Sequence, residues 1–225
     1  EEKAGNKFSR IESHPPKKDI SEIYGIIPKD RDTPYEMREI LERLVDDSLL
    51  REYKAHYGKT LICAYARIDG WAVGIIANER KMVKTGKGEM QLGGVIYSDS
   101  ADKASRFIMN CNQKGIPLLF IQDVNGFMVG SRSEQNGIIK DGAKMVNAMA
   151  NSVVPKFTLI IGNSFGAGNY AMCGKAYDPR LILAWPTARM AVMGGEQASK
   201  VILKLEENKL NKEDKKLTKS EKSDL

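Results

Sequence analysis

Histidine and paired cysteine are scarce in this sequence, and their scarcity limits the chemistry that side chains can perform. Only two histidines occur among the 225 residues, His14 and His56, and neither lies near a glycine-rich segment. Both are interpreted as surface histidines rather than general bases. No GxSxG elbow, P-loop or HExxH pattern is present. An enzyme built on this chain therefore needs chemistry that requires little from side chains.

Other absences exclude several classes of protein. The three cysteines, Cys63, Cys111 and Cys173, are widely spaced, which argues against a disulfide framework or a metal site and for a reducing, cytoplasmic location. No apolar run reaches the roughly 18 residues of a membrane span. The net charge of +6 is spread along the chain without a basic stripe interleaved with aromatic residues, so neither a nucleic acid nor a membrane is expected as a partner.

The chain divides into three parts by composition. Residues 1–19 are polar and contain Pro15-Pro16, which is typical of a flexible linker. One α/β domain is expected over residues 20–203, and a charged helical insertion or tail over residues 204–225. The first residues have no initiator methionine and no apolar core of a signal peptide, so an internal piece of a longer polypeptide is expected.

Two local patterns near the start of the domain are specific. The run Thr33-Pro34-Tyr35-Glu36 predicts a helix that Thr33 caps, with Glu36 completing a capping box. Residues 61–68 and 71–77 are rich in β-favouring types and enclose Asp69-Gly70. That dipeptide predicts a hairpin closed by a type I′ turn.

Further along the chain, apolar strands alternate with helices, which indicates an α/β architecture. A strand at 118–121 is followed by a glycine-bearing loop at 125–130 and by a helix from about Glu134. The apolar face predicted for that helix consists of Ile138, Ile139, Gly142, Met145, Val146 and Met149.

The strand–turn–helix pattern then occurs a second time. A buried strand at 157–161 leads to a glycine-bearing segment at 164–168, which opens a helix predicted to run toward Ala176. In both segments the glycines leave backbone N–H groups unobstructed, and a helix start adds a positive dipole end. One amide from each segment would form an oxyanion hole. A tight turn with close helix–sheet packing is the alternative for each segment alone.

Four runs of residues carry a family resemblance that covers roughly residues 20–203. They are similar to the carboxyl-terminal half of the carboxyltransferase (β) subunit of biotin-dependent acyl-CoA carboxylases, closest to the methylcrotonyl-CoA branch. The runs are IPLLFIQDVNGFMVG (116–130), NGIIKDGAK (136–144), FGAGNYAMCGKAY (165–177) and AWPTARMAVMGGEQ (184–197).

The resemblance implies a fold, an activity and partners. The implied fold is α/β, of the crotonase-type ββα spiral. The implied activity moves a carboxyl group from carboxybiotin to the α or γ carbon of an acyl-CoA, through enolates held in backbone oxyanion holes. Biotin would arrive on a separate carrier protein or domain, with a biotin carboxylase/biotin carrier subunit as partner. The acyl-CoA half would come from a partner subunit of a homo-oligomer, so the piece alone is expected to be inactive.

The same resemblance implies roles for individual residues. Ala167 and Gly168 would donate the biotin-side amides at the helix start, and Gly166 and Phe127 would also contact biotin. Gly126 and Phe127 would supply the opposing catalytic amide. Tyr170 would influence the choice of acyl substrate, with simple packing in the helix groove as the alternative.

Three other functions stay open from the residues. The first is a carboxyltransferase subunit of a biotin-dependent decarboxylase, of the glutaconyl-CoA type. The second is a stand-alone enoyl-CoA hydratase or isomerase, which usually needs active-site carboxylates. Only Asp123 and Glu134 lie near a glycine-rich turn. The third is a non-enzymatic binding and assembly module.

Overall fold

The computed structural model describes residues 8–30 and 33–212. The chain forms two compact units, one that ends at Met190 and one that begins at Ala191. The second unit contains the helix α7 (Gly195–Lys212). The predicted charged helical segment at 204–225 therefore includes helix as far as Lys212, and residues 213–225 lie outside the described residues, as do residues 1–7 of the predicted linker.

One large mixed sheet forms the centre of the first unit. Its strand order is β1-β2-β3-β7-β9-β10, and β11 also pairs with β9. The pairs β1–β2 and β2–β3 are antiparallel, whereas β3–β7, β7–β9 and β9–β10 are parallel. The strands are Arg51–Glu52, Leu61–Ile68, Trp71–Asn78, Leu118–Val124, Lys156–Phe165, Leu181–Ala184 and, for β11, Arg189–Ala191.

Two small sheets lie beside the large one. The strands β4 (Val83–Lys84) and β5 (Met90–Gln91) form an antiparallel hairpin. The strands β6 (Val95–Ile96) and β8 (Gly126–Phe127) pair in parallel. The second small sheet thus fixes one of the two predicted glycine-bearing segments.

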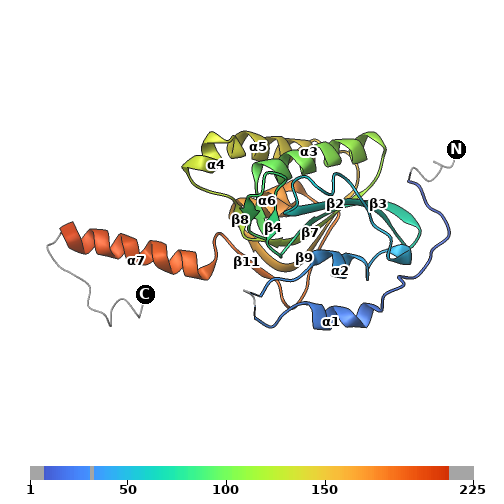
Figure 1. The fold of residues 1–225 in the computed structure, drawn as a ribbon, viewed down its shortest axis with the longest axis horizontal. Helices are drawn as coiled ribbons and strands as arrows, with labels where there is room; N and C mark the ends of the chain where they lie inside the picture. Colours follow the sequence, from blue (N-terminus) through green and yellow to red (C-terminus); the bar gives the residue numbers. More distant parts are fainter. Residues whose placement is uncertain (1–7, 31–32, 213–225) are drawn as a thin grey trace. The chain divides into compact units, whose positions relative to one another are not determined.

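Helices cover both faces of the large sheet (Figure 1). On one face lie α3 (Ser98–Gln113), α4 (Ser131–Gln135), α5 (Ile138–Ala150) and α6 (Gly166–Ala171). On the other lie α1 (Ile23–Ile26) and α2 (Met37–Leu41). Three 3₁₀ turns connect elements: Ile20–Glu22, Asp46–Ser48 and Lys175–Tyr177.

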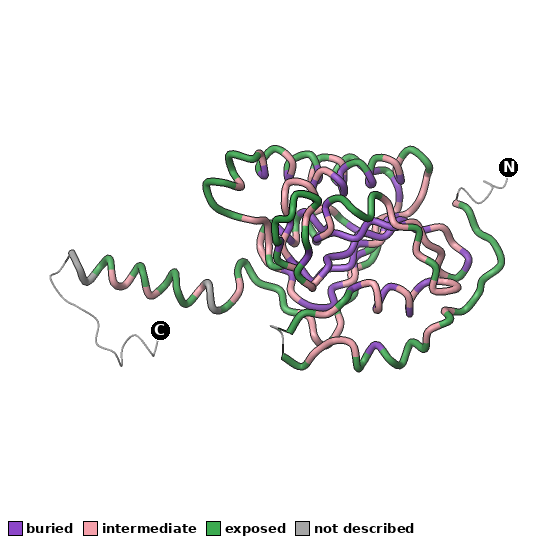
Figure 2. Tube along the Cα trace, viewed as in Figure 1, coloured by how far each residue is buried: buried purple, intermediate pink, exposed green. Residues whose placement is uncertain are grey.

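Two apolar clusters, one on each face of the large sheet, form the core. Figure 2 shows the buried residues gathered between the layers.

The predicted hairpin is confirmed. The strands β2 and β3 are joined by Asp69 and Gly70, whose φ angles of 50° and 76° are those of a type I′ turn. The amino-terminal segment runs along this hairpin. The Ile11 N–H donates to the carbonyl of Gly70 at 3.1 Å, and the Ala72 N–H donates to the carbonyl of Ser9 at 3.0 Å. Part of the stretch interpreted as a linker is therefore hydrogen-bonded to the domain.

The predicted cap at Thr33 is wrong. The helix α2 begins at Met37, and its N-cap residue Glu36 makes no side-chain cap. The Thr33 hydroxyl instead donates to the Asp30 carboxylate at 3.3 Å. The Met37 N–H donates to the buried carboxylate of Glu79 at 3.2 Å. A carboxylate distant in sequence thus takes over the capping role that local residues were expected to fill.

Two further helix predictions need correction. Ile139 is 73% exposed, whereas Ile138, Gly142, Met145 and Met149 are buried. The predicted helix is in fact two, α4 and α5, and Ile139 turns to solvent although the rest of the predicted face of α5 is buried or partly buried. The helix α6 ends at Ala171 instead of running toward Ala176, because Cys173 takes a left-handed φ of 59°.

Candidate functional site

The second glycine-bearing segment forms the start of α6. The strand β9 passes directly into this helix at Gly166, whose φ of 47° is a conformation that glycine adopts without strain. Ala167 is exposed and Gly168 is buried. The first N–H groups of a helix have no acceptor within it and form the positive end of its dipole. This helix start can therefore stabilise a negative oxygen.

The first glycine-bearing segment forms β8, which lies against α6. The Met128 N–H donates to the carbonyl of Ile96 at 2.8 Å. The Asn125 N–H also donates to the carbonyl of Gly94 at 2.7 Å, so Gly126 and Phe127 lie between two backbone hydrogen bonds to the β6 segment. The Phe127 ring packs on α5, where a Cβ added to Gly142 would lie 2.9 Å from it. The side chain of Phe127 is thus used for packing between β8 and α5.

The two segments are in direct contact, as Figure 1 shows for β8 and α6. A Cβ added to Gly168 would lie 2.6 Å from Cγ2 of Val124 and 3.1 Å from Cα of Gly126. Only a residue without a side chain permits this approach. The structure therefore brings together Gly126, Phe127 and the start of α6, which belong to the two segments that sequence reasoning had paired.

Tyr170 lies on the same short helix. Its side chain is half exposed and meets the ring of Tyr177 edge-to-face, with the ring centroids 5.8 Å apart. An edge-to-face partner restricts the ring while leaving part of it open to a ligand.

Asp123, at the end of β7, is held by three groups that sequence reasoning missed. Its buried carboxylate accepts hydrogen bonds from the Tyr35 hydroxyl at 2.7 Å and from the Asn163 N–H at 2.8 Å. Its Oδ2 also lies 3.3 Å from Nε of Arg80. Burial and the adjacent Asp123 carboxylate raise the pKa of Tyr35, which keeps its hydroxyl protonated as a donor. No local pattern marks these long-range partners.

Neither carboxylate weighed for a stand-alone hydratase is placed for acid–base chemistry. Asp123 is buried and fully engaged, and Glu134 is exposed on α4. The thiols offer no nucleophile, because burial raises the pKa of Cys63 and Cys111 to about 12 and that of Cys173 to about 11. Both histidines are exposed, which confirms that they are surface residues.

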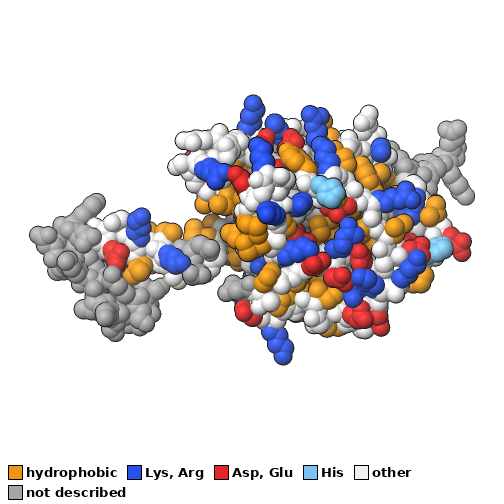
Figure 3. Space-filling view, viewed as in Figure 1, with side chains coloured by type: hydrophobic (Ala, Val, Ile, Leu, Met, Phe, Trp, Pro, Cys, Tyr) orange, Lys and Arg blue, Asp and Glu red, His pale blue; other side chains and the backbone are white. Residues whose placement is uncertain are grey.

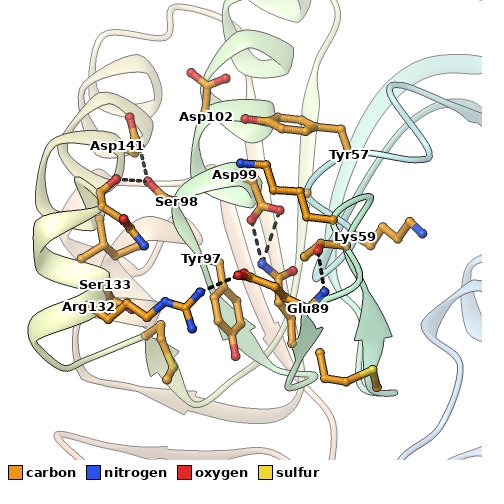
Figure 4. A pocket seen from close by; sticks show the side chains of 18 of the residues that line it. Tyr57, Lys59, Glu89, Tyr97, Ser98, Asp99, Asp102, Arg132, Ser133 and Asp141 are labelled. Atoms are coloured by element: carbon orange, nitrogen blue, oxygen red, sulfur yellow. Dashed lines mark hydrogen bonds and ion pairs between the residues drawn. The ribbon is translucent and has the colours of Figure 1, made fainter.

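A groove of about 1050 Å³ opens beside β8 (Figure 4). The loop that follows Phe127 contributes Met128 and Val129 to its lining, and the opposite wall carries Tyr57, Lys59 and the β4–β5 hairpin. Figure 4 shows an ion pair between Glu89 and Arg132. The lining charges are of both signs, with Lys59 and Arg132 beside Glu89, Asp99 and Asp102.

Charged side chains of both signs lie on the surface of the described residues (Figure 3). Figure 3 shows basic and acidic side chains interspersed on the visible face of the chain. Within residues 8–30 and 33–212, no three His, Cys, Asp or Glu side chains gather to hold a metal ion. In the same residues no helix combines the length and apolar character needed to cross a membrane.

Comparison with known proteins identifies the family. The family model described as "Carboxyl transferase domain" matches residues 2–225. The chain belongs to the carboxyl transferase domain family. It is 48% identical over 204 residues to the mitochondrial methylcrotonoyl-CoA carboxylase beta chain of Dictyostelium discoideum. The aligned residues make up 91% of this chain and 32% of that protein. It is 49% identical over 187 residues to the biotin-dependent 3-methylcrotonyl-coenzyme A carboxylase beta1 subunit of Mycobacterium tuberculosis, covering 83% of this chain and 33% of that protein.

The structural comparison agrees with the family assignment. The crystal structure of the P. aeruginosa geranyl-CoA carboxylase beta subunit superposes with a TM-score of 0.80 at 42% identity, covering 90% of this chain and 37% of that one. The carboxyl transferase domain therefore has the crotonase-like α/β fold that the sequence resemblance implied. The chain spans about a third of the length of the curated relatives it matches.

Proposed function

We propose that this chain is the biotin-side half of a carboxyltransferase subunit, which helps move a carboxyl group from carboxybiotin to the α or γ carbon of an acyl-CoA. The observation that carries the proposal is the contact of Gly168 with Gly126, which joins two amide-bearing segments in a member of the carboxyl transferase family.

The residues present fit biotin's uncharged, oxygen-bearing ureido ring. Ala167 is exposed at a helix start, and Gly166 and Gly168 carry no side chain that would shield the backbone. In the proposal the N–H groups of Ala167 and Gly168 hold the ureido oxygen, and that of Gly126 or Phe127 approaches from β8. Bound carboxybiotin supplies the carboxyl group. The chain's part is to orient the ring and stabilise negative charge on its oxygen.

Tyr170 is the proposed contact for the acyl group. It is 52% exposed one helical turn after Gly166, and its aromatic edge suits a branched apolar acyl chain. We therefore propose methylcrotonyl-CoA, or a close branched acyl-CoA, as the substrate class. The names of the relatives in the comparison support this choice over a linear acyl-CoA.

The partners follow from the part of the reaction that this chain lacks. A biotin carboxylase with a biotin carrier protein or domain would deliver the carboxyl group, and the acyl-CoA half of a second subunit in a homo-oligomer would bind the acceptor. The chain alone is then inactive. A reducing, cytoplasmic location is proposed from its three free, buried cysteines.

The test compares two substitutions at Ala167 in the full-length subunit. Ala167→Pro removes one N–H at an exposed position that already carries a Cβ. It should lower kcat for carboxylation of methylcrotonyl-CoA by roughly 100-fold. Ala167→Ser keeps the N–H and should stay within about threefold of the unmodified enzyme. Propionyl-CoA serves as the second acceptor, and thermal unfolding verifies that both variants fold. A folded Ala167→Pro variant with undiminished transfer would place the biotin oxygen elsewhere.

A further inference from the structure

A buried chain of polar side chains connects β7 and β9 to α6, and Gln122 stands at its centre. Gln122 is 0% exposed within an apolar strand. Its Nε2 donates to the backbone carbonyl of Met172 at 2.6 Å, at the end of α6. Its Oε1 accepts a hydrogen bond from the Ser164 hydroxyl at 2.5 Å. A buried amide with both ends satisfied is strongly held in one orientation.

The chain continues from Ser164 into the helix itself. The Ser164 Oγ accepts a hydrogen bond from Nδ2 of Asn169 at 2.8 Å. The backbone carbonyl of Asn169 accepts from the Gly174 N–H at 2.8 Å. A Cβ added to Gly174 would lie 1.8 Å from Oδ1 of Asn169, so the backbone at Gly174 packs closely against the Asn169 side chain. Gln122 is thereby linked to the middle of α6 through Ser164 and to its end through Met172.

The helix needs such support. It has six residues, and helices shorter than about 12 residues are marginal without tertiary contacts. Its start lies against Gly126 through Gly168. Rotation or translation of α6 would therefore move the amides of Ala167 and Gly168 relative to β8, and a misplacement of about 1 Å can lower a rate 100-fold.

We propose that Gln122 is a positioning residue of the carboxyl transfer reaction, which acts through Ser164 and Asn169 to hold the amides at the start of α6 against β8. This inference rests on the proposed function. Gln122 does not touch the reacting groups, so its effect is on kcat rather than on affinity for acyl-CoA.

The experiment uses the full-length subunit with its charged biotin carrier. Gln122→Met keeps the side-chain length but neither donates to Met172 nor accepts from Ser164. Ser164→Ala removes a single hydroxyl and carries the test if Gln122→Met does not fold. The control is Ser105→Ala, because the Ser105 hydroxyl donates to the backbone carbonyl of Lys144 at 3.3 Å between α3 and α5, away from α6.

The readouts are kcat, KM for acyl-CoA and thermal unfolding. We expect Gln122→Met to lower kcat at least 10-fold and Ser164→Ala about 5-fold, with KM for acyl-CoA within twofold. The Ser105→Ala control should keep kcat within twofold. Variants at Gln122 and Ser164 that match the control at equal thermal stability overturn the positioning role alone. An unmodified subunit that transfers no carboxyl group overturns the proposed function, and the positioning role with it.

Discussion

A methyl group added at Gly168 is the most direct test of the contact between α6 and β8. In Gly168→Ala the new Cβ would lie 2.6 Å from Cγ2 of Val124 and 3.1 Å from Cα of Gly126. Carbon atoms in contact are separated by about 3.5–4.0 Å. The helix start must therefore move by roughly 1 Å, and overpacking of this kind lowers stability by about 1–3 kcal/mol. The same displacement should lower kcat about 100-fold.

A second substitution separates this steric effect from other causes. Val124 is fully buried, so Val124→Ala alone should destabilise the fold by about 2 kcal/mol through the cavity it leaves. In the double variant the methyl added at residue 168 occupies part of that cavity. The double variant should therefore be at least about 1 kcal/mol more stable than the sum of the single effects, and should recover at least 10-fold in kcat over Gly168→Ala.

Urea unfolding and steady-state transfer to methylcrotonyl-CoA in the full-length subunit measure both quantities. The reasoning is refuted if Gly168→Ala folds with unchanged stability and transfers at the unmodified rate, because α6 and β8 then do not meet at Gly168. Strictly additive stabilities in the double variant would instead show that Val124 is not the residue that the methyl contacts.

Two further predictions concern side chains away from this contact. His14→Ala and His56→Ala in the full-length subunit should each leave kcat within about threefold; a loss of 100-fold at either would reveal a side-chain base. Lys103 is fully buried with its Nζ 3.7 Å from Glu52, which also pairs with Arg38 at 2.9 Å. Burial lowers the pKa of Lys103 below 10.5, so the buried ammonium group reduces the stability of the fold at neutral pH. The unfolded chain holds this proton more tightly, so stability should rise with pH between the lowered pKa and 10.5. Lys103→Met should abolish that rise and be at least as stable at pH 7 as the unmodified protein, as measured by urea unfolding at pH 7 and pH 10. A loss of stability above about 2 kcal/mol at pH 7 would contradict the argument.

The parts of the fold that the sequence predicted are those whose physical cause is local. Asp69 and Gly70 define the hairpin turn through their own backbone preferences, so the turn was predicted correctly. The cap at Thr33 was wrong because the deciding acceptor, Glu79, lies 42 residues beyond Met37. Ile139 was assigned to the core because it is apolar and follows Ile138, although it turns to solvent on α5. The break between α4 and α5 was missed although Asn136-Gly137 is a turn signal, and Gly137 has a left-handed φ of 91°.

In the candidate site too, features with a local cause were predicted and long-range contacts were not. The segments around Gly126 and Gly168 were selected because glycine after an apolar strand is a local signal. Their contact depends on the sheet order, in which β7 and β9 are neighbours. Gln122 was missed, although a polar amide inside the apolar strand 118–124 was a usable signal that it has buried partners. Its partners lie 42 and 50 residues away, where no single-sequence pattern reaches.

Gln122 and Asp123 together hold the end of the sheet that carries the proposed site of backbone amides. Neighbouring residues of a strand point to opposite faces, so Gln122 reaches Met172 on the α6 face while Asp123 reaches Tyr35 on the α2 face. The register of β7 against β9 shifts between Gln122 and Val124, which interrupts the ladder hydrogen bonds there.

Side chains replace the missing ladder bonds at this irregularity. The Asp123 N–H donates to Oδ1 of Asn78 at 3.1 Å, and the Asn163 N–H donates to the Asp123 carboxylate at 2.8 Å. Side-chain oxygens thus satisfy these two backbone N–H groups where regular pairing is interrupted. Both β8 and α6 begin within three residues of this place. The irregular register therefore lies directly beside the contact between Gly126 and Gly168, where both strands leave the sheet.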